Sequence, residues 1–349
     1  MFKPFYTITD LLLANIKRIN NLINELNNRR FPDVVLLEFE RVAREISAHA
    51  STSIEGNPLP LTEVKKILKN KPVHLRESEK EVINYNQALK DLNQKIESEK
   101  VKLSIELILS IQKQVTKDLL PSFESGYLRK KPIVVNNPRN GQIVYLPPDV
   151  KDVKPLLTDL INFINENRET IDPFILAGIF HKHMVIIHPF MDGNGRTTRL
   201  ATKVLLADMG LNTFNLFSFE NYYNKNVTRY FETVGAYGNY YDLADKIDFT
   251  FWLEYFTEGI IDELLRVQAL LPMVATTPQN ELQPYHLKML KAIQEKGFIT
   301  DKDYVKLTER AKATRAQDFN KLIELGLIER QGSGKNTYYK LKENKLGTH

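Results

Sequence analysis

The sequence predicts a mainly α protein with one β-hairpin in its main domain and a winged-helix domain towards its C-terminal end. Apolar residues recur at three- and four-residue steps through most of residues 7–271, as the buried face of a helix requires. Two short β-type runs flank an Asn-Gly pair, which is a strong hairpin signal. Beyond residue 280, three helical patterns precede a second short hairpin, the layout of a winged helix.

The helical patterns follow one another along the main domain. The first two lie within residues 7–50, are separated by residues 31–35, and end in the polar stretch 51–58. Thr62 and Ser78 stand where N-caps are expected, ahead of a short helix over 64–68 and a long one reaching Leu92. The remaining helices are expected over residues 104–120, 150–167, 173–187, 197–209, 223–234 and 249–271.

The β-hairpin is expected where residues 133–135 and 143–146 form two short apolar runs. Asn140 and Gly141 lie between them, and both residue types tolerate the positive φ that a tight hairpin turn needs. Pro147 and Pro148 end the second strand.

The C-terminal region begins after residues 273–280, which have the composition of a linker. Helices are expected over 285–296, 300–307 and 311–325, followed by strands around 326–330 and 337–341. The last helix carries basic residues that would suit phosphate contacts, and acidic residues that dilute this charge. DNA binding and protein docking are therefore both open for this region, and the residues concerned are Arg310, Lys312, Arg315 and Lys321 against Glu309, Asp318 and Glu324.

Composition excludes several classes of protein. The chain of 349 residues is long enough for two or three domains, and it has no cysteine, so disulfides and thiolate chemistry are excluded. The N-terminus does not resemble a signal peptide, and no run of about 18 apolar residues indicates a membrane span, so the cytoplasm is the expected compartment. The net charge of +5 suits nucleotide or nucleic-acid contacts without choosing between them.

Residues 188–199 concentrate the groups that carry chemistry. Two glycines allow a tight turn whose N–H groups converge, and the start of a helix adds partial positive charge to the same space. Two arginines three residues apart share a helix face, where both can reach phosphate oxygens. A carboxylate suits Mg²⁺ beside phosphates, and a histidine supplies a base. The segment therefore predicts a polyphosphate site, and its residues are His188, Asp192, Gly193, Asn194, Gly195, Arg196 and Arg199.

This segment matches, at every specified position, the pattern HxFx(D/E)GNGRxxR of the Fic family, so the chain resembles Fic proteins. The resemblance extends over residues 100–265. Residues 126–129 and the hairpin through 145–148 resemble the Fic flap, which holds a target segment by strand addition. Residues 220–230, with Tyr222, Asn226 and Tyr230, resemble the segment that closes over the nucleoside. The fold implied is a Fic-type helical core with a β-hairpin flap.

The resemblance implies a transfer of AMP from ATP to a Ser, Thr or Tyr hydroxyl of a protein, with Mg²⁺ as the metal. It makes His188 the general base and Asp192 the metal ligand. The α-phosphate would be oriented by Asn194 and the backbone of Gly193 and Gly195, the β-phosphate bound by Arg196, the γ-phosphate bound by Arg199, and the nucleoside contacted by Asn226.

An inhibitory pattern of the same family, (S/T)xxxE(G/N), is met by residues Ser51 to Gly56. By resemblance, Glu55 would pair with Arg199 and keep it from the γ-phosphate, so that ATP binds out of line for attack. The expected domains are an N-terminal helical extension with the inhibitory motif (1–98), a Fic catalytic core (99–272) and the winged helix (280–345).

Two further functions stay open beside autoinhibited AMP transfer. The same fold suits removal of AMP, with Glu55 positioning a water, or transfer of another phosphate-linked group. From a different class, a DNA-binding regulator would use the core only as a nucleotide sensor. An intact His188 and Asp192 favour catalysis, because binding alone needs no general base. The sequence leaves open the target protein (the chain itself included), a homodimer, the nucleotide base and the trigger that relieves inhibition.

Overall fold

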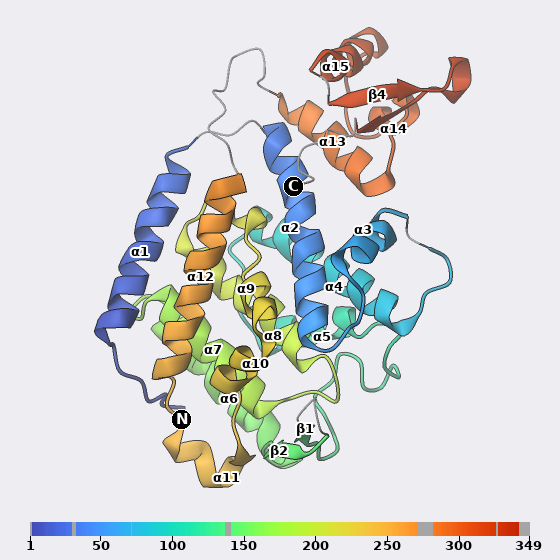
Figure 1. The fold of residues 1–349 in the computed structure, drawn as a ribbon. Helices are drawn as coiled ribbons and strands as arrows, with labels where there is room; N and C mark the ends of the chain where they lie inside the picture. Colours follow the sequence, from blue (N-terminus) through green and yellow to red (C-terminus); the bar gives the residue numbers. More distant parts are fainter. Residues whose placement is uncertain are drawn as a thin grey trace. The chain divides into compact units, whose positions relative to one another are not determined.

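The computed structural model describes residues 2–29, 33–70, 72–136, 141–270, 282–325 and 327–341, without the side chains of residues 33–35, 38 and 335. The chain forms two compact units (Figure 1). Met1–Asn28 and Val42–Leu270 make the first unit, and Arg29–Arg41 and Leu271–His349 make the second. The domain boundary expected near residue 98 does not separate these two units, because α4 (Glu77–Ser98) and α5 (Ile105–Val115), on either side of it, pack together within the first unit. That boundary stays a prediction.

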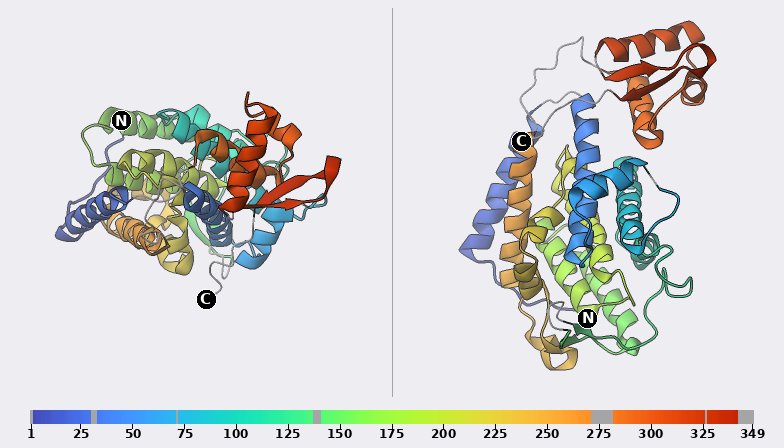
Figure 2. Two further views of the ribbon diagram at one scale, coloured as in Figure 1. Left: turned by 90° about the horizontal axis from the view of Figure 1, so that it is seen from above. Right: turned by 45° about the vertical axis from the view of Figure 1, so that its right-hand side comes forward.

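The first unit is helical and is built around one almost fully buried helix. All residues of α7 (Pro173–Ile187) except Pro173 and Val185 are buried, because apolar residues lie on every side of the helix, and the polar run 181–183 is buried among them. Helices α6 (Val150–Asn167), α8 (Asn194–Leu206) and α12 (Thr250–Leu270) pack against it. The views of Figures 1 and 2 show α1 (Asp10–Asn27) and α12 side by side. The unit is completed by α2 (Asp33–Ile54, from Val42 onward), α3 (Leu61–Asn70), α9 (Glu220–Lys225), α10 (Val227–Val234) and α11 (Tyr240–Leu243).

Several predicted helix ends are wrong in detail. Thr62 and Ser78 lie inside α3 and α4, so neither is an N-cap, and Arg76 takes that position for α4. Ser104 is an N-cap, since its side chain accepts a hydrogen bond from Leu107 N at 3.2 Å, but α5 ends at Val115 rather than near 120. The helix expected over 223–234 is two helices, because Asn226 leaves helical geometry and caps α10.

The predicted hairpin is present as an antiparallel pair of β1 (Val135–Asn136) and β2 (Ile143–Leu146). Its turn falls partly on residues 137–140, which lie outside the described residues. A third strand, β3 (Gly238–Asn239), pairs with β2 in parallel. β2 is therefore the central strand, and β1 and β3 form the edges of this sheet. β3 was not predicted, because a strand of two residues has too short a pattern to be seen in the sequence.

The second unit contains α13 (Pro284–Lys296), α14 (Asp301–Val305), α15 (Lys312–Glu324) and an antiparallel pair of β4 (Ile328–Gln331) and β5 (Tyr338–Leu341). These match the elements expected from sequence, and the identification as a winged helix stays a prediction. Their core holds Met289, Ile299, Tyr304 and Phe319. The linker expected over 273–280 lies outside the described residues. Among the helices that are described, none is both long and apolar enough to cross a membrane.

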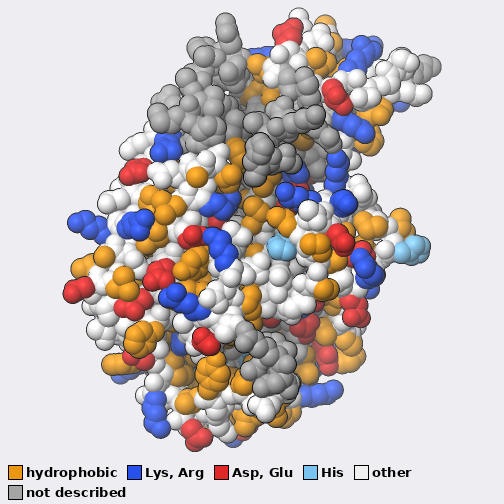
Figure 3. All heavy atoms as spheres, viewed as in Figure 1, with side chains coloured by type: hydrophobic (Ala, Val, Ile, Leu, Met, Phe, Trp, Pro, Cys, Tyr) orange, Lys and Arg blue, Asp and Glu red, His pale blue; other side chains and the backbone are white. Residues whose placement is uncertain are grey.

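Charge on the surface is mixed where it can be seen. On the face drawn in Figure 3, basic and acidic side chains are interspersed. The net charge of +5 therefore does not by itself mark a nucleic-acid surface there.

Candidate functional site

The predicted polyphosphate loop joins the end of α7 to the start of α8. His188 ends α7 in the left-handed conformation, with φ 49°, and Gly193 precedes α8 with φ 77°. A Cβ at Gly193 would also lie 2.8 Å from Thr116 Cγ2, so glycine is needed there for two reasons. These two residues turn the chain tightly, and the N-terminus of the 13-residue α8 faces the loop that precedes it.

Asn194 fixes this loop from within. Its side chain accepts a hydrogen bond from Phe190 N and donates one to Phe190 O, both at 2.9 Å, and it is buried. The resemblance gave Asn194 the α-phosphate. The structure instead uses its amide group to close the loop, so its contribution to an anion would come from the loop that it shapes.

His188 presents one ring nitrogen for chemistry. Its Nδ1 lies 3.3 Å from Val185 O, and since a carbonyl only accepts, Nδ1 carries the hydrogen and Nε2 keeps its lone pair. Burial lowers the pKa of the imidazole, while the nearby charges of Glu55 and Asp192 oppose that shift. The ring is therefore neutral at pH 7. Arg129, from the flap segment, donates through Nε to His188 O at 2.9 Å and holds the loop in place.

Asp192 is suited to a hard cation. Its side chain is 50% exposed, with Oδ1 accepting from Gly193 N at 2.6 Å and Oδ2 from Arg196 Nη2 at 2.9 Å. In the described part of the chain no three acidic or histidine side chains gather as a metal site. A single carboxylate fits Mg²⁺, which completes its shell with phosphate oxygens and water.

Arg196 is buried without full hydrogen bonding. Its side chain is 3% exposed, and Nη1 lies 3.3 Å from Glu81 Oε1 of α4, a contact that has the distance of an ion pair but makes no hydrogen bond. Nε also lacks an acceptor. Buried guanidinium N–H groups without acceptors are costly, so this residue is prepared for an anion.

Arg199 is bonded to the end of α2 and the residue that follows it. It is fully buried, and it donates from Nε to Ser51 Oγ at 2.7 Å, from Nη2 to Ser51 O at 2.8 Å, and from Nη2 to Glu55 Oε1 at 2.7 Å. The Glu55–Arg199 pair expected from the motif is thus present. A Cβ at Gly195 would lie 2.0 Å from Glu55 Oε1, so the carboxylate lies directly against the α8 backbone.

The structure brings together the loop residues with Ser51 and Glu55, but not with Asn226. Asn226 is exposed, and its side chain accepts from Arg229 N at 3.1 Å as the cap of α10. Tyr230 is buried rather than open to a nucleoside. Its hydroxyl lies 2.9 Å from His181 Nε2 and accepts from Arg199 Nη1 at 3.5 Å.

His181 was missed by the sequence reasoning. Thr202 Oγ1 lies 3.0 Å from its Nδ1, so Thr202, His181 and Tyr230 form a hydrogen-bonded chain that ends on Arg199. The polar run His181, Lys182 and His183 within the otherwise apolar α7 is the signal that could have drawn attention to it, because buried polar groups need partners.

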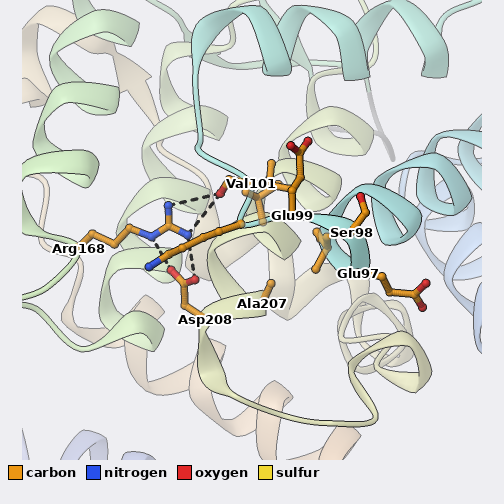
Figure 4. A pocket seen from close by; sticks show the side chains of 10 residues that line it. Glu97, Ser98, Glu99, Val101, Arg168, Ala207 and Asp208 are labelled. Carbon is orange, nitrogen blue, oxygen red and sulfur yellow. Dashed lines mark hydrogen bonds and ion pairs between the residues drawn. The ribbon is translucent and has the colours of Figure 1, made fainter.

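A separate pocket lies away from the loop (Figure 4). It is lined by residues 96–101 together with Arg168, Val204, Ala207 and Asp208, and two of its charged groups, Arg168 and Asp208, are paired with each other. It shares no residue with the loop site and supplies none of its predicted groups.

The basic residues of the second unit are partly used within it. Arg310 forms two bonds to Asp318, at 2.8 and 3.1 Å, and its guanidinium stacks 3.7 Å from the Tyr285 ring centre. Arg315 forms two bonds to Asp301, at 2.8 and 3.0 Å. Two of the four side chains considered for DNA phosphates thus already have anionic partners.

The region of the chain that matches known proteins includes the loop of residues 188–199. Residues 102–206 match a family model described as Fic/DOC family. The protein adenylyltransferase fic-1 of Caenorhabditis elegans is 30% identical over 201 residues, which cover 56% of this chain and 38% of that protein. The protein adenylyltransferase Fic of Drosophila erecta is 27% identical over 217 residues, which cover 57% and 42%. The chain therefore spans about two-fifths of the length of the curated relatives it matches.

Solved structures show the same fold. A Fic family protein from Desulfovibrio desulfuricans G20 superposes with a TM-score of 0.64 at 20% identity, covering 100% of both chains. Fic-1 of C. elegans superposes with a TM-score of 0.58 at 23% identity, covering 74% of this chain and 72% of that one. Residues 102–206 therefore form a Fic domain within a mainly helical chain of the Fic fold.

Proposed function

We propose that the Fic domain of residues 102–206 makes this chain a protein adenylyltransferase, which transfers AMP from ATP to a Ser, Thr or Tyr hydroxyl and is autoinhibited by Glu55. The observation that carries the proposal is the buried Arg196, whose Nε and Nη1 lack hydrogen-bond acceptors beside the N-terminus of α8. Phosphate oxygens would satisfy these groups and the helix end together. The adenylyltransferase relatives support the same reaction.

The reaction assigns His188 as general base. The neutral Nε2 takes the proton of the target hydroxyl as its oxygen bonds to the α-phosphorus. The bond between the α-phosphorus and the oxygen leading to the β-phosphate breaks, and pyrophosphate leaves. Magnesium held by Asp192 would supply positive charge between the phosphates. Arg196 binds the β-phosphate and Arg199 the γ-phosphate, so the site contributes mainly position and charge.

The flap would supply the acceptor. β2 is paired on both sides, so an extended target segment would add to an edge of the sheet, and β1 is the edge strand of the hairpin. Arg129 ties the flap segment to the carbonyl of His188, so a segment bound there would have its hydroxyl close to the base.

Autoinhibition follows from competition for one arginine. While Arg199 binds Glu55, the γ-phosphate lacks its cation and meets a carboxylate instead. Incubation of the full chain and of Glu55→Gly with ATP and Mg²⁺, followed by mass spectrometry of the chain and of candidate targets, tests the proposal. A gain of one adenylyl mass, larger in the variant, is expected. Binding of ATP with no transfer to any hydroxyl, in either protein, would refute adenylyl transfer and favour a nucleotide sensor.

A further inference from the structure

Arg196, like Arg199, has a carboxylate from outside the loop close to its guanidinium. Glu81 of α4 places Oε1 at 3.3 Å from Arg196 Nη1, and its side chain is 25% exposed against 3% for Arg196. Arg196 is also bonded to Asp192, but Asp192 is the residue suited to the cation. Glu81 is therefore the carboxylate that remains on Arg196 when Asp192 is used elsewhere.

Glu81 is also tied to the inhibitory segment. Its Oε2 accepts from Asn57 Nδ2 at 2.7 Å, and Asn57 follows Glu55 by two residues. Asn57 is itself fixed, since its backbone N donates to Thr52 O at 3.1 Å and its Oδ1 accepts from Leu59 N at 3.1 Å. The turn after α2 thus contacts both arginines. Its Glu55 is paired with Arg199, and its Asn57 is bonded to Glu81, the carboxylate next to Arg196.

We propose that Glu81 is a positioning residue of the nucleotide site that keeps Arg196 from the β-phosphate in the resting protein, as Glu55 keeps Arg199 from the γ-phosphate. The inference rests on the proposed function of the loop. A carboxylate this close to the arginine neutralises it and repels an incoming phosphate. Because the contact makes no hydrogen bond, the Nε and Nη1 hydrogens remain available to a better-placed acceptor.

The two carboxylates act on different phosphates, which gives each a separate signature. ADP ends at the β-phosphate, so its binding depends on Arg196 and Glu81. ATP adds the γ-phosphate, which depends on Arg199 and Glu55. Removing the charge of Glu81 therefore tightens ADP and ATP alike, whereas removing Glu55 tightens ATP more than ADP. AMP, with neither phosphate, serves as the reference ligand.

Calorimetric titration of the full chain with the magnesium complexes of ADP and ATP, and with AMP, tests this in wild type, Glu81→Gln and Glu55→Gly. Glu81→Gln keeps the shape of the side chain and an oxygen for Asn57. We expect about fivefold tighter binding of ADP and ATP, the upper range for a partly exposed ion pair, and no change for AMP. Glu77→Gln, an exposed change on the same helix, is the matched control and should leave all three constants unchanged.

Unchanged or weaker ADP binding by Glu81→Gln, with tighter ATP binding by Glu55→Gly, overturns the role of Glu81 and leaves the proposed function standing. Failure of every protein to bind ATP or ADP overturns both. Thermal unfolding of Glu81→Gln without nucleotide checks the fold. Glu81→Ala repeats the measurement with the carboxylate absent, and loss of the ADP effect there overturns the inference as well.

Discussion

Replacing Glu55 by glycine changes the surroundings of one buried cation. Arg199 is fully buried, and Glu55 is the carboxylate to which it is paired. Removing one partner of a fully buried ion pair costs roughly 3–5 kcal/mol, because the other charge stays uncompensated. Here the Glu55 side chain is 31% exposed, and Ser51 still accepts two hydrogen bonds from Arg199. Both facts reduce the expected loss to about 2 kcal/mol.

This loss has two measurable consequences of opposite sign. Without nucleotide, unfolding of Glu55→Gly should occur about 4–8 °C lower than in wild type, given the size of the first unit. With ATP and Mg²⁺, the γ-phosphate takes the place of the carboxylate, and the difference should close. In the variant, ATP does not have to displace Glu55. The free energy of about 2 kcal/mol that this displacement costs in the wild type should therefore appear as an increase of about 30-fold in the rate of adenylyl transfer.

Thermal unfolding with and without nucleotide, together with transfer of label from ATP, measures both consequences on one preparation. Glu63→Gly is the matched control, because it makes the same exchange at an exposed position of α3, outside the turn that carries Glu55 and without contact to Arg199 in any described interaction. It should cost up to about 1 kcal/mol of stability and leave transfer unchanged. An equal loss of stability with and without ATP, or transfer at the wild-type rate, would refute the competition between Glu55 and phosphate.

Four other outcomes are expected. His188→Ala in the Glu55→Gly background should lose all transfer while still binding ATP, and retained labelling would remove His188 from the mechanism. Burial lowers the pKa of His188 below its usual 6.5, so transfer by Glu55→Gly should fall only when acid protonates the ring. The acid limb of the kcat/KM profile should therefore lie below pH 6.5, and an acid limb above that value would contradict the neutral base. Tyr230→Phe, which removes the hydroxyl between His181 and Arg199, should weaken ATP roughly threefold in titration and leave AMP unaffected. Arg310→Ala in the full chain should not reduce duplex DNA binding measured at low salt, since Asp318 already holds that side chain; a reduced salt dependence would assign Arg310 to phosphate.

The sequence could indicate the residues of the loop together because their signal is local. Residues 188–199 are contiguous, and turn, helix start and charge follow from neighbours along the chain. The Glu55–Arg199 contact joins residues 144 positions apart, and only the family pattern indicated it. Glu81 lies on a helix with no such pattern. Its relation to Arg196 depends on how α4 packs against α8, which periodicity does not specify.

Polar residues inside helices were the other weakness of the sequence reasoning. Asn226 and Tyr230 were expected near the nucleoside because residues 220–230 resemble the Fic segment that closes over it. The structure uses Asn226 to cap a helix and Tyr230 to contact Arg199. Side chains that can serve either a ligand or a neighbouring backbone are not separated by composition, because the same hydrogen-bonding capacity suits both. Helix cores such as 150–167 and 173–187 were predicted to the residue, since there burial alone sets the pattern.

Under the proposed autoinhibition, the contact between Glu55 and Arg199 would be one of two ways to meet the same physical demand. A guanidinium that is fully buried needs an anion in every state of the protein, so Arg199 cannot simply be released. Glu55 is partly exposed, so in the proposed switch its carboxylate would return to water, at the cost of about 2 kcal/mol given above, while a phosphate takes over the arginine. In the proposed switch, the resting and active states would therefore differ in which anion Arg199 binds. A modest push on the turn that carries Glu55 and Asn57 is enough to change the balance, and any trigger of activation should act on that turn.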